Sequence, residues 1–172
     1  MSDDPCDEAR VIADLGKIKA AKNINDYLNH YITVMDTKAS AFLAGNVAAA
    51  SFLLHDMPGQ GWLRAAYVLA LVLFADSVAV AGAVIFPRLP ATGSSIIFWG
   101  DIAARQGLNE YIADFNRIVD GGQMDEQYCA QNFFAARVLR RKYNCLRWSI
   151  ILFFAALLAA FGVYLALPHM GA

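Results

Sequence analysis

One acidic side chain, Asp76, interrupts an apolar segment that runs from residue 65 to residue 86. A carboxylate at the centre of a membrane helix costs about 2.5–3.5 kcal/mol, so such residues usually face a bundle interior or water. Asp76 therefore either lines a pore and titrates there, or is protonated or hydrogen-bonded to Asn46 or Ser77 of a neighbouring helix. Asp76 is a candidate pore residue, and so is Asn46, which interrupts an earlier apolar segment.

The sequence Asp36-Thr37-Lys38 lies at the entrance to that earlier segment. In one interpretation Asp36 and Lys38 form part of a switch, with Asp36 as a gating residue and Lys38 in a ligand site. In the other, Lys38 is an anchor that reaches toward the membrane surface, and Asp36 is its local partner. Spacing alone leaves both interpretations open.

A basic cluster lies just before the last apolar segment. Arginine binds phosphate in bidentate geometry, so the cluster is a candidate site for the phosphate of a nucleotide. Alternatively, its side chains bind lipid head groups and set the membrane topology. The cluster consists of Arg137, Arg140, Arg141, Lys142 and Arg147.

Aromatic side chains between the second and third apolar segments offer flat surfaces on which a base could stack. They are Phe98, Trp99, Tyr111, Phe115 and Tyr128. Alternatively, they form the core of a small helical bundle. Trp99 and Tyr111, together with the neighbouring Asp101, complete the set of ligand-binding candidates.

Signs of catalysis are lacking in the sequence. The three cysteines and three histidines are scattered without a metal-ligand spacing, and there is no Ser-His-Asp set, phosphate-binding loop or dinucleotide motif. We therefore expect no enzyme, no metal site and no cofactor. A net charge of −1 also argues against a nucleic-acid partner.

The composition indicates how these residues are positioned. Of the 172 residues 58% are hydrophobic and only 17% are charged, whereas soluble domains have about 45–50% and about 25%. The excess lies in three blocks, residues 39–54, 65–86 and 149–167. Residues 148–167 contain no charge and are long enough to cross a bilayer core of about 30 Å. The first block is short, so a buried soluble helix is the alternative for that block alone.

The distribution of cations predicts the orientation of a chain with three membrane spans. All 14 Lys and Arg residues except Arg64 fall on one side, which the positive-inside tendency makes cytoplasmic. The N-terminus is then inside, and Pro168–Ala172 lies outside. The fold class we expect is an all-α membrane protein with three transmembrane helices and a small helical cytoplasmic bundle.

Four regions follow from this topology. Residues 1–38 form a cytoplasmic helix that leads into the membrane, with an apolar stripe through Val11, Leu15 and Ile18 that continues at Ile24, Leu28, Tyr31 and Met35. Residues 39–87 form a hairpin of two spans, residues 88–147 a cytoplasmic helical region, and residues 148–172 the third span and tail. The stripe must be buried against residues 88–147 or against a second copy of the chain.

Within the cytoplasmic region, residues 106–119 read as a short helix that ends at Asp120-Gly121-Gly122, because glycine readily takes the left-handed conformation needed there. A further helical pattern runs from Asp125 into the third span. Both outer spans are then the membrane halves of long helices.

Four short motifs occur in an order, and at distances from the spans, that resemble a known family. They are Asp36-Thr37-Lys38-Ala39, Phe98-Trp99-Gly100-Asp101-Ile102, Glu110-Tyr111-Ile112 and Lys142-Tyr143. Over about residues 25–167 the chain resembles the transmembrane effectors of bacterial Pycsar anti-phage systems. It departs from the usual pattern at Ser40-Ala41-Phe42-Leu43, where the family usually has more Leu, and at Trp99, where the family usually has Phe.

The resemblance implies a function. A partner cyclase makes a cyclic pyrimidine mononucleotide, cCMP or cUMP, after infection, and the effector senses it and impairs the bacterial inner membrane. Abortive infection, a homo-oligomer and partnership with the lipid bilayer are part of this expectation. The nucleotide pocket would be helical, since the residues available do not read as a β-roll. The alternative is a small transport or channel accessory subunit in which Asp76 is an ion site.

Overall fold

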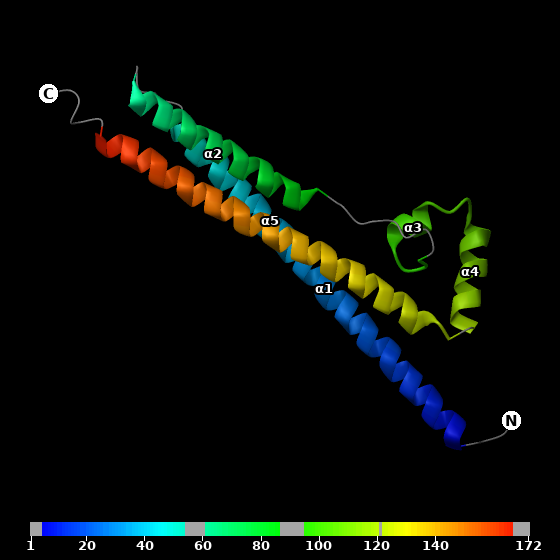
Figure 1. Cartoon of the computed structure of the whole chain (residues 1–172). Coiled ribbons are helices and arrows are strands. Elements are labelled where there is room, and N and C mark those ends of the chain that lie inside the picture. Colours follow the sequence, from blue (N-terminus) through cyan, green and yellow to red (C-terminus); the bar gives the residue numbers. More distant parts are fainter. Residues whose placement is uncertain (1–4, 54–60, 87–94, 121, 167–172) are drawn as a thin grey trace. The chain divides into compact units, whose positions relative to one another are not determined.

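The computed structural model describes residues 5–53, 61–86, 95–120 and 122–166. Every regular element in these ranges is a helix (Figure 1). The helices are α1 (Pro5–Leu53), α2 (Trp62–Ile85), α3 (Trp99–Ala103), α4 (Leu108–Asp120) and α5 (Met124–Ala166). The expected all-helical fold class is thereby confirmed for the described residues, and the predicted tail, Pro168–Ala172, lies outside them.

The two long helices predicted from the sequence are present. Helix α1 has 49 residues and begins at Pro5, and α5 has 43 residues. Proline is tolerated in the first turn because the N–H groups there have no partner within the helix. Each helix continues without interruption from a charged stretch into an apolar one, as expected.

Glycine ends α4 where the sequence predicts. Gly122 has a φ of +67°, a conformation that costs glycine little because it has no Cβ. Its N–H donates to the carbonyl of Val119, and the N–H of Gln123 donates to Ile118. This pair of bonds is the Schellman motif, which satisfies carbonyls that the helix end would otherwise leave free.

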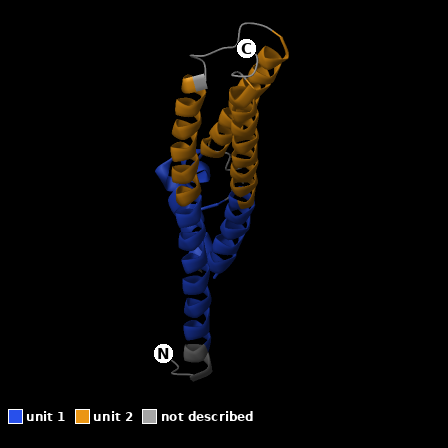
Figure 2. Cartoon of the chain, turned by 90° about the vertical axis from the view of Figure 1, so that its left-hand side faces the viewer, with its two compact units in different colours: residues 1–32, 88–139 blue, residues 33–87, 140–172 orange. Residues whose placement is uncertain are grey.

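The chain divides into two compact units, which Figure 2 distinguishes by colour. Unit 1 consists of residues 1–32 and 88–139, and unit 2 of residues 33–87 and 140–172. Helices α1 and α5 therefore contribute residues to both units.

In unit 2, α2 packs with the second parts of α1 and α5. One cluster joins Ala39, Val84 and Leu146, and another joins Leu63, Tyr67 and Val163. The buried residues of α2 are spaced alternately by four and three positions, from Leu63 through Tyr67, Ala70, Phe74, Ser77 and Ala81 to Val84. A repeat of 3.5 residues keeps one face toward its neighbours, as in a coiled coil.

In unit 1, the contact between α1 and α5 is made by small and amide side chains. Ala21 and Asn25 are buried, whereas Ile24 and Tyr31 of the predicted stripe are exposed, as are Val11 and Leu15. These positions are not buried within the chain, because its buried residues follow the 3.5-residue repeat, and burial of the stripe against a second copy stays a prediction. Small side chains at the contact let two helices approach closely.

Two helices, α2 and α5, are the described helices long and apolar enough to cross a membrane. The predicted first span is not one of them, since its apolar run is short and lies within a helix otherwise rich in charged residues. Three spans and their orientation stay predictions.

Candidate functional site

A buried ion pair joins α1 to α5 in unit 2. The ammonium group of Lys142 pairs with Asp36 and also donates to the carbonyl of Val84, at the end of α2, over 2.7 Å. Lys142 is only 8% exposed. Its charge is compensated by one carboxylate and one carbonyl oxygen, as a buried ammonium requires. The local pairing of Asp36 with Lys38 is therefore wrong, because Asp36 pairs across the bundle.

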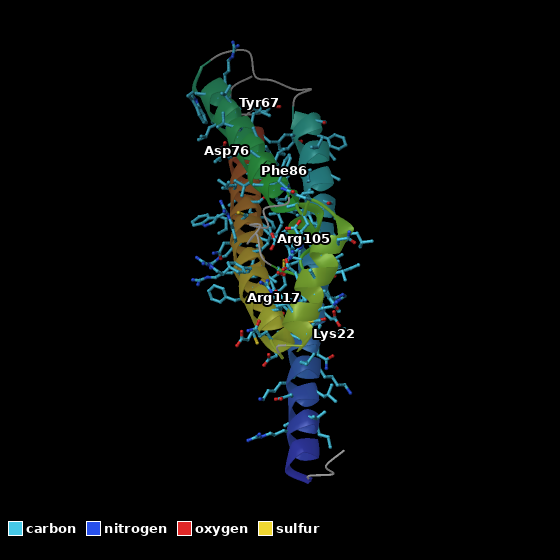
Figure 3. The ribbon with its side chains drawn as sticks, turned by 90° about the vertical axis from the view of Figure 1, so that its right-hand side faces the viewer. Lys22, Tyr67, Asp76, Phe86, Arg105 and Arg117 are labelled. Atoms are coloured by element: carbon cyan, nitrogen blue, oxygen red, sulfur yellow. The ribbon has the colours of Figure 1, made fainter. Side chains whose placement is uncertain are left out.

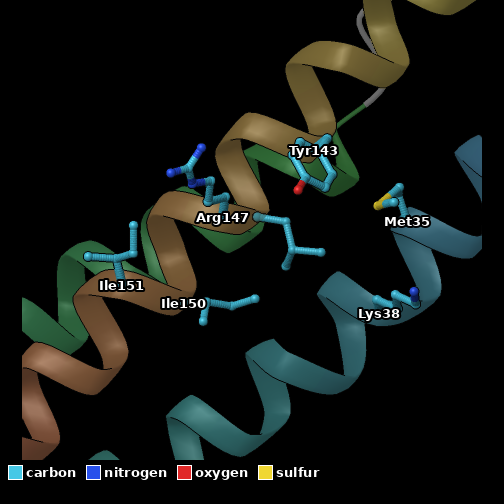
Figure 4. Close-up of a pocket in the computed structure, with 7 residues that line it drawn as sticks. Met35, Lys38, Tyr143, Arg147, Ile150 and Ile151 are labelled. Carbon is cyan, nitrogen blue, oxygen red and sulfur yellow. The ribbon is translucent and has the colours of Figure 1, made fainter.

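A cavity of about 350 Å³ lies beside this ion pair in unit 2. Met35 and Lys38 come from α1, and Tyr143, Arg147, Ile150 and Ile151 come from α5 (Figure 4). Leu146 completes the lining. Two of the predicted candidates, Lys38 and Arg147, thus line the same cavity.

A neutral polar cluster lies in the centre of unit 2. The Ser77 hydroxyl lies 2.9 Å from the amide oxygen of Asn46 and 2.8 Å from the carbonyl of Ser149, and the Ser149 hydroxyl donates to the carbonyl of Ser77 over 2.7 Å. All three residues are fully buried. Asn46 also donates to Phe42 of its own helix. This candidate pore residue therefore lies inside the bundle, where it links three helices.

Asp76 has the opposite orientation. It is exposed on α2 (Figure 3), although its neighbour Ser77 is buried. Successive residues of a helix are rotated by about 100°, so one of the two faces inward and the other outward. The interpretation in which Asp76 bonds Asn46 or Ser77 is wrong, because Ser77 takes that place.

In unit 1, Asp101 organises the start of α3. Its carboxylate accepts the N–H of Ser95 at 3.0 Å, and the Ser95 hydroxyl accepts the N–H of Phe98 at 3.1 Å. Asp101 is buried, and a Cβ on Gly100 would lie 2.6 Å from the ring of Phe98. Much of the Phe98–Ile102 motif is thereby explained by local packing, without a ligand.

An arginine that the sequence analysis did not single out, Arg105, is central to unit 1 (Figure 3). It forms a largely buried ion pair with Asp114, which also pairs with Arg117 at 3.0 Å. Its guanidinium carbon lies 5.8 Å from the centre of the Tyr111 ring. The Tyr111 hydroxyl lies 3.4 Å from the carbonyl of Ile96. The signal available in the sequence was the spacing of nine residues between Arg105 and Asp114, which becomes informative only once α3 and α4 are placed.

Other candidates remain exposed. In unit 1, Trp99 is 68% exposed beside the ring of Phe98, and Arg137 lies over the ring of Phe133 at 5.5 Å. In unit 2, Arg140 and Arg141 are exposed on α5. The predicted set is therefore divided: Trp99, Asp101, Tyr111 and Arg137 belong to unit 1, and Lys38, Arg140, Arg141 and Lys142 to unit 2.

Comparison with known proteins identifies a family. Residues 20–168 match the Pycsar effector protein domain, so the similarity covers both units and most of the chain. No curated protein and no solved structure matches the chain. The match agrees with the resemblance found in the short motifs, and with two helices apolar enough for a membrane protein. The chain therefore belongs to the Pycsar effector family and is an effector of anti-phage defence.

Proposed function

We propose that this chain is an inner-membrane effector that a cyclic pyrimidine mononucleotide, cCMP or cUMP, activates to impair membrane integrity. The family match over residues 20–168 is the observation that carries the proposal. The apolar helices α2 and α5 support a site of action in a bilayer. The chain acts by binding and conformational change and has no catalytic step.

Unit 2 provides the membrane part of this proposal. Residues 33–53 of α1 pack with α2 and α5 through Ala39 and Asn46. A third span here would complete the bundle, and the cations would then lie on the cytoplasmic side, as the positive-inside tendency favours.

Unit 1 provides side chains suited to a nucleotide. Trp99 presents an exposed ring to a base, and Arg137 an exposed guanidinium to the cyclic phosphate. Further exposed cations, which belong to unit 2, are Arg140, Arg141 and Lys38. Lys142 and Asp101 are already engaged by protein groups, so we assign them to holding the fold.

The exposed position of Asp76 is an argument that the chain forms a homo-oligomer. An exposed carboxylate in the middle of an apolar helix is costly against lipid, so it is expected to face another subunit or a water-filled path. The exposed Val11 and Leu15 offer a second surface for association.

Coupling between ligand and membrane follows from the long helices. Helices α1 and α5 contribute to both units, so a change at unit 1 reaches unit 2 through continuous backbone. The nucleotide shifts the population toward the damaging arrangement by its higher affinity for that arrangement.

The decisive experiment is dye uptake by cells that express the chain, with cCMP, cUMP and purine cyclic nucleotides supplied one at a time. We expect uptake with a cyclic pyrimidine only, and calorimetric binding of the same nucleotide to the purified protein. Absence of both signals would refute the proposal. Uptake without any nucleotide would favour a transport or channel subunit.

The role of Asp76 is tested by Asp76→Asn, which removes the charge and keeps the shape. Assembly should persist, because the side chain makes no contact that the bundle of one subunit requires, while nucleotide-dependent dye uptake should change. Asp26→Asn is the matched control, an exposed carboxylate outside the apolar segments. Nucleotide-dependent uptake in Asp76→Asn equal to that of the original chain would exclude a role for Asp76 in the pore.

A further inference from the structure

The cavity between α1 and α5 in unit 2 has an unbalanced charge. Lys38 and Arg147 line it, and no acidic residue does. The nearest carboxylate along α1, Asp36, is paired with Lys142. Two cations therefore line the cavity, although their charged ends point in different directions (Figure 4).

The remaining lining is apolar. Met35, Leu146, Ile150 and Ile151 provide most of the surface, and Tyr143 adds a ring with a polar end. Figure 4 shows Ile150 and Ile151 further along α5 than Arg147, in the direction of the apolar segment. Toward the apolar segment the two cations are thus followed by an apolar end, while Met35 and Tyr143 lie on their other side.

The exposed surface next to the cavity is also apolar on the side of Ile150 and Ile151. Trp148, which follows Arg147, is 61% exposed, and tryptophan is enriched at the interface between membrane and water. Phe154 is exposed one turn beyond Ile150. A ligand that fits both ends has an anionic head and a hydrocarbon chain, whereas a free nucleotide would leave the apolar end unfilled.

We propose that this cavity binds an anionic phospholipid, with the anionic head group among Lys38 and Arg147 and an acyl chain along Ile150 and Ile151. The lipid would contact α1 and α5 together, next to the ion pair of Asp36 with Lys142. Binding is then expected to favour the arrangement of the helices in which the cavity is open to the bilayer.

The test uses the full chain with Trp62→Phe and Trp99→Phe, which leaves Trp148 as the fluorescent reporter. The protein is reconstituted in vesicles of phosphatidylcholine that contain a small fraction of brominated phosphatidylglycerol or brominated phosphatidylcholine. Quenching of Trp148 should be stronger with the brominated anionic lipid. Lys38→Gln and Arg147→Gln should each lower that preference about fivefold, since one cation near the surface contributes about a factor of this size.

Arg141→Gln is the matched control. It removes the same charge from α5 and lies about 120° around the helix from Arg147, so it should retain the preference. Equal quenching by the two lipids would overturn the proposal, and so would an equal loss in Arg141→Gln, which would indicate attraction to the membrane surface in general.

Soluble phosphate compounds separate the possible sources of the anion. Quenching that persists with excess inorganic phosphate or cCMP supports a lipid, whereas displacement by either would show a site for a soluble phosphate and overturn the proposal. These measurements need no activation by nucleotide. If the quenching measurements refuted the lipid site, the dye-uptake test of the proposed function would still stand. If dye uptake refuted the proposed function, the lipid site would still be testable by quenching.

Discussion

Asparagines of α1 make polar contacts in both units, but their surroundings differ. In unit 1, Asn25 donates to Asn132 over 3.0 Å, and Asn132 is only half-buried. In unit 2, Asn46 meets Ser77 and Ser149, and all three are fully buried. Water can replace a lost bond in unit 1, whereas a bond lost inside an apolar bundle has no such replacement. This explains why the polar cluster inside unit 2 contains no charged group and why its three side chains are hydrogen-bonded within the cluster.

Ion pairs do not show this contrast, since Arg105 in unit 1 and Lys142 in unit 2 are equally buried, with side chains 8% and 9% exposed. The ion pair of Arg105 with Asp114 in unit 1 is shared with the exposed Arg117. In unit 2, the buried Lys142 lies beside Asp36, which is about one-third exposed, and at the end of α2. A charge is placed where a partner and some solvent remain within reach.

Lys142→Ala should give the largest effect. It leaves Asp36 and the carbonyl of Val84 without their partner, and removing one member of a buried pair costs about 3–5 kcal/mol. We expect about 3 kcal/mol, since Asp36 keeps some solvent, measured by unfolding in detergent micelles followed by circular dichroism. Arg141→Ala is the control and should change stability by less than about 0.5 kcal/mol.

A double variant sharpens this prediction. Asp36→Asn combined with Lys142→Met removes both charges and should recover most of the loss, because no unpaired charge remains. If Lys142→Ala were as stable as the original chain, the ion pair would not hold α1 to α5.

Gly100→Ala should cause the second-largest loss of stability, and the loss should be confined to unit 1. Its Cβ would lie 2.6 Å from the buried ring of Phe98, and overpacking of this kind costs about 1–3 kcal/mol. Emission from Trp99, whose ring lies 5.5 Å from that of Phe98, should report the change. Gly107→Ala is the control, since no atom lies within 4 Å of its added Cβ. Equal stability of the two variants would contradict the packing described for α3.

The smallest difference is between the two asparagine contacts. Asn46→Ala removes a fully buried side chain and should cost about 1–2 kcal/mol, part of it for the cavity. Asn132→Ala loses the bonds to Asn25 and Ala21, with water as a substitute, and should cost about 1 kcal/mol. Chemical unfolding in micelles measures both, and the reverse order would refute the contrast between the units.

Much of the fold could be predicted because it depends on local sequence. The glycine at position 122 ends α4, and uninterrupted helical patterns give α1 and α5. The alternation of four and three residues in α2 was also readable. Ser77 belongs to that series and Asp76 does not, so the repeat predicts that Ser77 faces inward.

The candidate site was less predictable, because its contacts join distant residues. Lys142 was chosen as a phosphate ligand, yet it pairs with Asp36, 106 positions earlier. Lys38 and Arg147 were both identified as cations, but their shared cavity requires the packing of α1 against α5. Arg105 was not singled out, because it lies in the turn between α3 and α4 and meets its partner Asp114 only when α4 is placed.

The sequence by itself determined where helices form, where apolar segments lie and to which family the chain belongs. The helices and apolar segments follow from residue type and periodicity over one or two turns, and the family follows from the match of residues 20–168. Only the tertiary structure decided which face of each helix is buried, and therefore that Lys142 holds the bundle, that Asp76 faces outward and that Lys38 and Arg147 line one cavity. The orientation of a helix about its axis is set by the helices packed against it, which come from far along the chain.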